Sequence, residues 1–338
     1  MRKIILILLC VVLQGLWLNA QDIHFSQFGN SPVMINPAQT GFFNGAHRFT
    51  SNYRSQWGSF TVPFRTFSFS YDMQPAYRLI KNDMLGVGAW VYGDKAGDSD
   101  HGILQTSLSL SYIFSLNESD NNHLGVGFLS SWAQRQMSYD KLYFDQQFNG
   151  EYFDPSLPTG EDKGTKSYSY FDFNVGVHWR YQPGKDNYYN AGVSFSHITR
   201  PSQTFQNNET SRLPMKTIAY GNLSVPFDAE HAIVPGFMSA FQGTASEIVV
   251  GMDYRYTLAP KKYNYTALSP GLYYRTGDAL ILAVQLDYQH WRFGVSYDMN
   301  ISDLSNASRG LGGLEMAIIY KLPRTDIHRR DAIPCPIF

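Results

Sequence analysis

Residues 170–181 read YFDFNVGVHWRY. From Phe171 to Tyr181 every second side chain is apolar or aromatic, and the residues between them include Asp172, His178 and Arg180. Successive side chains of a β-strand point to opposite faces, so a period of two predicts a strand with one apolar and one polar face. Such a strand separates an apolar environment from a polar one.

The same alternation recurs along the chain and predicts fourteen strands, at residues 47–57, 66–73, 84–94, 102–115, 122–136, 168–182, 187–197, 215–226, 231–242, 246–257, 267–276, 279–289, 291–299 and 312–322. A run of about ten residues is the length that crosses a bilayer when a strand is tilted. Ionisable side chains lie in mid-strand on the polar face, at Arg54, Asp253 and Arg255. A polar lumen accepts such charges better than the core of a soluble sandwich. The sequence therefore predicts an all-β fold, a transmembrane antiparallel β-barrel of outer-membrane type with about 14 strands.

The composition agrees with a membrane barrel and excludes several other classes. Aromatic residues make up 15% of the chain and charged residues 16%, against about a quarter charged in an average soluble domain. The formal net charge is −1, which gives no sign of a nucleic-acid partner. The histidines show no paired metal spacing, and no Gly-x-Ser-x-Gly motif is present. We therefore expect neither an enzyme nor a metal site or cofactor.

The first twenty residues have the features of a secretory signal peptide. Arg2 and Lys3 are followed by an apolar run at residues 4–12, and residues 18–20 (LNA) form a plausible cleavage site. The predicted organisation is a signal peptide at 1–20, an irregular segment at 21–46 in the lumen or at the periplasmic rim, a barrel at 47–322 and a periplasmic tail at 323–338. An even strand number predicts that both termini are periplasmic and that the chain resides in the outer membrane.

The predicted connections alternate between short and long. The long ones, at residues 137–167 and 198–214, are expected outside the cell. Exposed aromatic residues are favoured as interface anchors, so the candidate partner-binding residues are Tyr143, Phe144, Phe148, Tyr152, Phe153, Arg200, Pro201 and Phe205. The alternatives are a first loop that folds over the barrel mouth and a second loop that is only structural.

Residues 25–45, FSQFGNSPVMINPAQTGFFNG, fit neither a strand nor a helix. They contain too many glycines and prolines for regular structure, yet they carry many apolar side chains that a solvated linker does not need. One interpretation is an N-terminal arm tucked against a core. The other is a plug that fills or lines the periplasmic half of the lumen, since a barrel of this size is wide enough for water. The candidate lumen and plug residues are Asn36, Pro37, Phe42, Phe43 and Arg54, with the Asn36 side chain bonded to nearby backbone.

Several motifs also occur in a fixed order along the chain: Phe25-Ser26-Gln27, Asn36-Pro37-Ala38, Gly41, Tyr53-Arg54-Ser55-Gln56-Trp57, Arg200-Pro201-Ser202-Gln203-Thr204-Phe205, Gly294-Val295-Ser296-Tyr297-Asp298 and Cys335-Pro336. This ordered set resembles the PorP/SprF family of type IX secretion and gliding outer-membrane proteins. The resemblance implies a non-enzymatic barrel that helps to secrete or anchor surface adhesins or other cargo. The implied partners are that cargo, other type IX secretion or gliding components and outer-membrane lipid. The alternative is a diffusion porin or a small-molecule transporter of the outer membrane.

Overall fold

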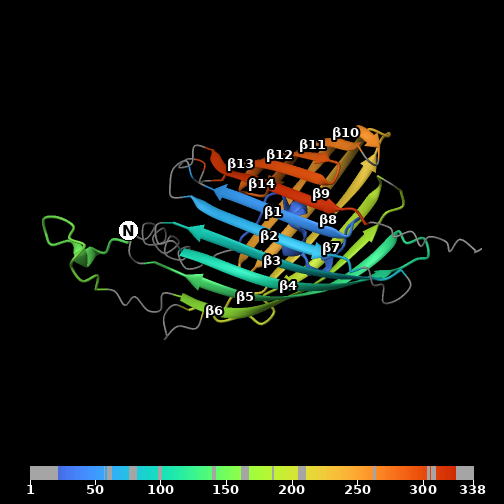
Figure 1. The fold of residues 1–338 in the computed structure, drawn as a ribbon. Coiled ribbons are helices and arrows are strands. Elements are labelled where there is room, and N and C mark those ends of the chain that lie inside the picture. The colour runs from blue at the N-terminus through green and yellow to red at the C-terminus, as the bar shows by residue number, and fades with distance from the viewer. Residues whose placement is uncertain are drawn as a thin grey trace, which may run out of the picture.

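The computed structural model is a closed barrel in which neighbouring strands are antiparallel and β1 pairs with β14 to complete the ring (Figure 1). The residues that it describes are 22–56, 58, 63–75, 82–97, 101–138, 142–160, 167–184, 186–204, 211–261, 264–302, 305 and 310–324. Closure leaves no unpaired sheet edge, which is the condition for a β-structure to lie in lipid.

Fourteen strands form the ring in the described residues. They are β1 (His47–Gln56), β2 (Phe64–Met73), β3 (Met84–Ala96), β4 (His101–Ser115), β5 (Asn122–Gln136), β6 (Ser167–Tyr181), β7 (Tyr188–Ser196), β8 (Lys216–Pro226), β9 (His231–Gln242), β10 (Ala245–Lys261), β11 (Asn264–Arg275), β12 (Ala279–Tyr288), β13 (Trp291–Asn300) and β14 (Leu311–Leu322). The predicted fold class and strand number are confirmed.

The hairpin between β10 and β11 differs most from the prediction. The sequence predicted a connection at residues 258–266, but β10 continues to Lys261 and β11 begins at Asn264. A register shift between Thr257 and Ala259 interrupts the alternation there. Because a bulge puts an extra residue into one strand, it moves later side chains to the other face and hides the strand from a period-two reading.

The two faces of the wall follow the predicted alternation. Leu108 on β4 is 71% exposed on the outside of the barrel, whereas its neighbour Ser109 is 1% exposed and faces the lumen. The lumen face is not polar everywhere, however. Ile218 on β8, Met238 on β9 and Ile281 on β12 are buried apolar residues of the inner surface. The prediction of a polar lumen therefore missed this apolar patch, and its side chains need an apolar partner inside the barrel.

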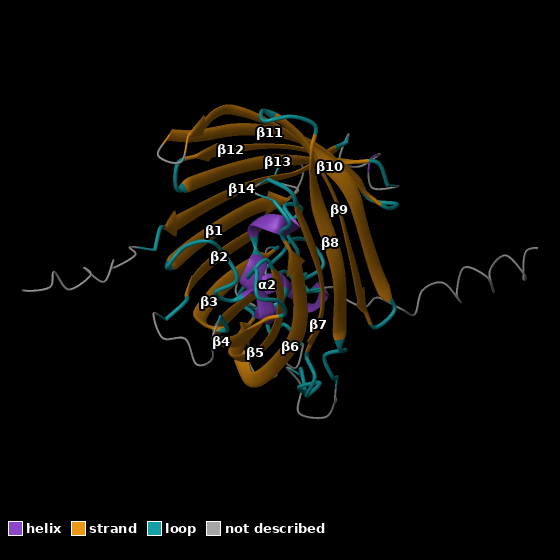
Figure 2. Cartoon of the chain, turned by 90° about the vertical axis from the view of Figure 1, so that its right-hand side faces the viewer, coloured by secondary structure: helices purple, strands orange, loops and turns teal. Residues whose placement is uncertain are grey.

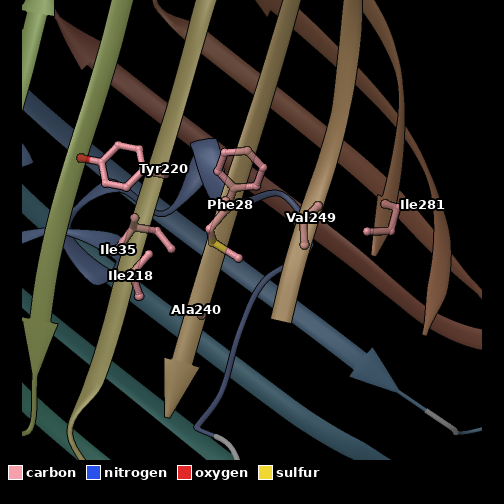
Figure 3. Packing of buried hydrophobic residues seen from close by; sticks show 8 residues of the cluster. Phe28, Ile35, Ile218, Tyr220, Ala240, Val249 and Ile281 are labelled. Atoms are coloured by element: carbon pink, nitrogen blue, oxygen red, sulfur yellow. The ribbon is translucent and has the colours of Figure 1, made fainter. Parts of the chain in front are cut away.

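The N-terminal segment supplies that partner. It folds into three short helices, η1 (Phe28–Asn30), α2 (Pro32–Ile35) and η2 (Pro37–Gln39), which lie within the ring of strands (Figure 2). A proline starts both α2 and η2, where its missing N–H costs nothing. Phe28 and Ile35 pack on the apolar patch of β8, β9, β10 and β12 (Figure 3). In the described residues, no helix has the length and apolarity that a bilayer crossing requires.

Candidate functional site

The candidate site is the lumen together with the segment that fills it. We call the rim where β1 begins and β14 ends the tail end, and the opposite rim the loop end. The Asp22 N–H donates to Gln242 Oε1 (3.0 Å), at the last residue of β9 and so at the loop end. The Ala46 N–H donates to the Leu322 carbonyl (2.8 Å) at the tail end. Residues 22–46, called the plug segment below, therefore run the full length of the lumen.

This course corrects one part of the sequence interpretation. The hypothesis confined the segment to the half of the lumen beside the start of β1, and its contacts instead reach the opposite rim. The predicted periplasmic location of both termini falls on residues outside the described ranges. Of the described residues, the first, Asp22, lies at the loop end and the last, Arg324, lies at the tail end. Residues 22–27 reach the loop end because the buried charged side chains that bind them lie nearer that rim.

Glu315 on β14 fixes the first part of the plug segment. Its Oε2 accepts from the Ser26 N–H (2.7 Å) and its Oε1 accepts from the Gln27 N–H (2.9 Å). The carboxylate is 1% exposed, so both hydrogen bonds form away from bulk water. β14 thus holds the backbone of the Phe25-Ser26-Gln27 motif directly.

Asp298 on β13 completes this clamp from the next strand. Its Oδ2 accepts from Ser26 Oγ (2.7 Å), Arg54 Nη2 (3.2 Å) and Arg275 Nη1 (3.0 Å). Arg54 also donates through Nη1 to the His24 carbonyl (2.6 Å). The predicted lumen residue Arg54 is therefore an inward side chain that links the wall to the plug segment. Such a network is stable only while each buried charge keeps its partners.

Asn36 attaches the middle of the plug segment to the wall. Its Nδ2 donates to the Val177 carbonyl on β6 (2.9 Å) and to the Val193 carbonyl on β7 (3.2 Å). Its Oδ1 accepts from the Ala38 N–H (2.9 Å) and so caps η2. The expected bond to nearby backbone is present, and the two bonds to the wall add what the sequence did not reveal.

Glycines in the wall make room for this attachment. A Cβ on Gly176 would lie 2.0 Å from Asn36 Oδ1, and one on Gly127 would lie 2.2 Å from the Ala38 nitrogen and 2.3 Å from the Pro37 carbonyl carbon. Non-bonded heavy atoms do not approach so closely. Only glycine lets the backbone of Pro37 and Ala38 lie directly on β5.

Phe42 and Phe43 pack near the tail end. The Phe42 ring meets the His178 ring edge-on, with centroids 4.7 Å apart. The Arg48 guanidinium carbon lies 4.6 Å from the centre of the Phe43 ring, and Arg48 is itself paired with Asp72 (2.6 Å). The five residues proposed for the lumen, which are Asn36, Pro37, Phe42, Phe43 and Arg54, are all buried and contact either the wall or the plug segment.

The proposed partner-binding residues lie in two separate loops. In the first, Tyr143, Phe148, Tyr152 and Phe153 are exposed and Phe144 is half-buried. This loop contains η3 (Asp145–Gln147) and lies beyond the strand ends (Figure 1). The loop is locally ordered, because Phe148 pairs with Phe153 in a β-bridge and the Tyr143 ring meets the Phe153 ring edge-on.

The second loop is tied to the barrel rim. Arg200 is exposed with a φ of 48°, and the Pro201 carbonyl accepts from the Leu213 N–H (3.0 Å). Leu213 is buried against Tyr170 of β6. Phe205 lies outside the described residues.

Sequence reasoning missed a latch at the loop end. His197 follows β7, with its Nε2 2.5 Å from Asp22 Oδ2 and its Nδ1 2.8 Å from Asp172 Oδ2. Burial lowers the pKa of His197, but the charge and hydrogen bonds of Asp22 and Asp172 outweigh burial and raise the pKa to about 9. Burial likewise opposes the charged form of Asp22, and His197 outweighs it, so that the pKa of Asp22 falls below its ordinary value. The only sequence signals were Asp172 on the polar face of its strand and a histidine, His197, with no assigned role.

This latch predicts a dependence of stability on alkaline pH. The pKa of His197 rises on folding from 6.5 to about 9. Its contribution is therefore complete below about pH 6.5 and is lost as the pH rises through about 9. We expect the wild-type melting temperature to approach that of His197→Gln between about pH 7 and 10. Circular dichroism melts of the two proteins at several pH values measure this, and a constant difference over that range would show that His197 is not charged in the fold.

The comparisons with known proteins bear on both fold and family. The family model described as "Type IX secretion system membrane protein PorP/SprF" matches residues 18–312. The chain belongs to this family. The resemblance drawn from the ordered motifs is thereby confirmed, and the protein is an outer-membrane barrel of the PorP/SprF family with no enzymatic role. Among curated proteins, none matches the chain.

Solved structures with a similar fold include hydrocarbon transporters. The toluene transporter TbuX of Ralstonia pickettii is 12% identical with a TM-score of 0.51, covering 88% of this chain and 94% of its own. The toluene transporter TodX of P. putida is 9% identical with a TM-score of 0.50, covering 88% and 95%. The monoaromatic hydrocarbon channel CymD is 10% identical with a TM-score of 0.50, covering 88% and 94%. At these identities the likeness shows the barrel fold alone.

Proposed function

We propose that this chain is a plugged outer-membrane barrel that anchors a secreted surface protein, such as an adhesin, or helps to secrete it, through the type IX machinery. Membership of the PorP/SprF family supports the machinery. The observation that carries the anchoring role is the filled lumen, in which residues from Phe25 to Phe43 are held by hydrogen bonds and packing to the wall. A barrel closed in this way acts by binding and not by catalysis or free diffusion.

The loop with Tyr143, Phe148, Tyr152 and Phe153 is the proposed contact with the cargo. Exposed aromatic side chains of a locally ordered loop supply contact area at a low entropic cost. Changing all four to serine should reduce the cargo that co-purifies with the barrel from solubilised outer membrane more than about tenfold, because each anchor of an interface contributes about 2 kcal/mol or more. The readout is quantitative mass spectrometry of co-purified proteins that are also labelled on intact cells.

The matched control is Phe227→Ser, since Phe227 is 64% exposed in the connection between β8 and β9 at the other rim. It should leave the cargo level unchanged. Equal cargo in the quadruple variant and the control would remove the loop from the proposal. Arg200→Ser and Pro201→Ser test the second loop by the same measurement.

The proposed orientation has the loop end outside the cell and the tail end in the periplasm, where the short connections meet other machinery components. Residues 1–20 then act as the export signal. In a Cys335→Ser background, Glu151→Cys should react with an impermeant maleimide on intact cells and Ser119→Cys should not; both positions are exposed. The reverse pattern would overturn the orientation. Gly160 is unsuitable for the cysteine, because its φ is 71° and a Cβ would lie within 2.1 Å of Gln146 Oε1.

The alternative function is a diffusion porin or a small-molecule transporter. The solved structures of similar fold include transporters, but a likeness of fold does not transfer a substrate. An open pore needs a continuous aqueous path. Most residues of the plug segment are buried, which argues against such a path, and ion conductance separates the two functions.

A further inference from the structure

A chamber at the tail end has no role in the function proposed above. It lies beside Phe42 and Phe43 of the plug segment and has a volume of about 650 Å³. Six basic side chains line it, which are Arg48, Arg180, Arg255, Arg292, Lys321 and Arg324. The carboxylates in its lining are those of Asp186 and Asp287. Basic side chains therefore outnumber carboxylates in the lining of the chamber.

Two of these cations are neutralised within the wall. Arg48 is paired with Asp72 (2.6 Å), a buried residue outside the lining. Arg292 is paired with Asp287, with Nε 2.6 Å from Oδ1 and Nη2 3.0 Å from Oδ2. Both pairs have the bidentate geometry expected of structural ion pairs. They account for one of the two lining carboxylates, which leaves four basic side chains and the carboxylate of Asp186.

Arg180 on β6 and Arg255 on β10 are the two arginines of the lining on which the proposal rests. In the described part of the chain, each makes a hydrogen bond to a neutral oxygen, from Arg180 to Gln182 Oε1 (3.0 Å) and from Arg255 to the Tyr188 hydroxyl (3.2 Å). Neither has a carboxylate partner among the described residues, and the Nε of each is buried without a hydrogen-bond partner there. A guanidinium whose buried Nε lacks an acceptor gains free energy when an anion supplies one.

One ring brings the two guanidiniums together. The Cζ atoms of Arg180 and Arg255 each lie 5.8 Å from the centre of the Tyr188 ring on β7. Both guanidiniums lie within the distance of about 6 Å at which a cation is attracted to an aromatic face, so Tyr188 helps to orient them. Lys321 on β14 contributes an amine to the same lining. The chamber thus presents several fixed donors from different strands to one volume.

We propose that this chamber binds a small organic anion that carries at least two phosphate or carboxylate groups. Guanidinium forks match the geometry of both groups. A volume of about 650 Å³ falls within the range of about 300–1,000 Å³ typical of small-ligand sites. Walls of low dielectric constant concentrate the positive potential inside the chamber, which favours a multiply charged ligand over chloride. Gly45, Pro323 and Arg324 in the lining place the opening at the tail end.

Isothermal titration calorimetry of the full-length protein in detergent tests the proposal, with inorganic pyrophosphate as the phosphate probe and citrate as the carboxylate probe. We expect at least one probe to bind the wild type with an affinity that falls as salt is raised. Combining Arg180→Gln with Arg255→Gln should weaken that binding at least about tenfold, because charge-assisted hydrogen bonds are lost. The relative affinity of the two probes distinguishes a phosphate ligand from a carboxylate one.

Arg65→Gln is the matched control, since Arg65 is an exposed arginine of β2 near the loop end, and it should leave the affinity unchanged. Each variant is first checked for the shift in mobility between unheated and boiled samples that an assembled barrel gives. Lys321→Met is a second test that keeps both guanidiniums and should also weaken binding. Failure of both probes to bind the wild type, or equal binding in an assembled Arg180→Gln and Arg255→Gln double variant, would overturn the proposal.

Discussion

Gly127→Val is expected to produce an assembled barrel that conducts ions where the wild type does not. A Cβ at this position would lie 2.2 Å from the Ala38 nitrogen and 2.3 Å from the Pro37 carbonyl carbon, both of them backbone atoms. Valine therefore forces the middle of the plug segment away from β5. The pairing of β5 with β4 and β6 can persist, since it uses only backbone groups. A barrel of this size has a water-filled interior unless something fills it, so current in planar bilayers measures the displacement.

Gly93→Val is the matched control for this prediction. Gly93 also lies in a strand, but the nearest atom to a Cβ there is the Ile103 carbonyl oxygen at 3.9 Å, an ordinary contact. This variant should stay closed and should assemble like the wild type. If Gly127→Val assembles and stays equally closed, the plug segment is not what closes the lumen.

Asp298→Ala should release the start of the plug segment and destabilise the protein by about 3–5 kcal/mol. The carboxylate accepts hydrogen bonds from Ser26, Arg54 and Arg275 and is 2% exposed. Alanine leaves two buried guanidiniums short of an acceptor and removes the partner of the Ser26 hydroxyl. Chymotrypsin should then cut after Phe25 or Phe28, and urea unfolding should have a lower midpoint.

Asp287→Ala separates the release of the segment from a general loss of stability. It removes an aspartate that pairs with Arg292 and is hydrogen-bonded to no residue of the plug segment in the described structure. It should lower the unfolding midpoint without exposing Phe25 or Phe28 to chymotrypsin. An Asp298→Ala protein that resists chymotrypsin as well as Asp287→Ala does would show that the clamp does not hold the segment.

The wall of the barrel could be predicted because its pattern is local. In residues 170–181 each side chain reports its own face, and the strand observed at this place is Ser167–Tyr181. Lipid outside and polar groups inside impose the same period on strand after strand. The prediction was weakest at the β10–β11 hairpin, where the register shift after Thr257 breaks that period.

The inside of the barrel could be predicted only in outline. The excess of apolar side chains in residues 25–45 indicated that the segment packs against something, and Asn36 was singled out for its side chain. The wall residues that bind the segment could not be predicted. Ser26 and Glu315, for example, are 289 residues apart in the sequence and meet only because the ring of strands closes. In the sequence, Ile218 and Met238 look like ordinary strand residues. Their role as an apolar patch in the lumen becomes clear only from the segment that covers them.

The single-channel conductance of the wild-type protein tests the central claim, that the plug segment closes the lumen, most directly. Protein purified in mild detergent is reconstituted into planar bilayers, and its assembly is confirmed by the mobility shift on heating. The account predicts no steady channel in the wild type and a steady channel in Gly127→Val. A steady channel in the assembled wild-type protein would contradict it and would favour a porin.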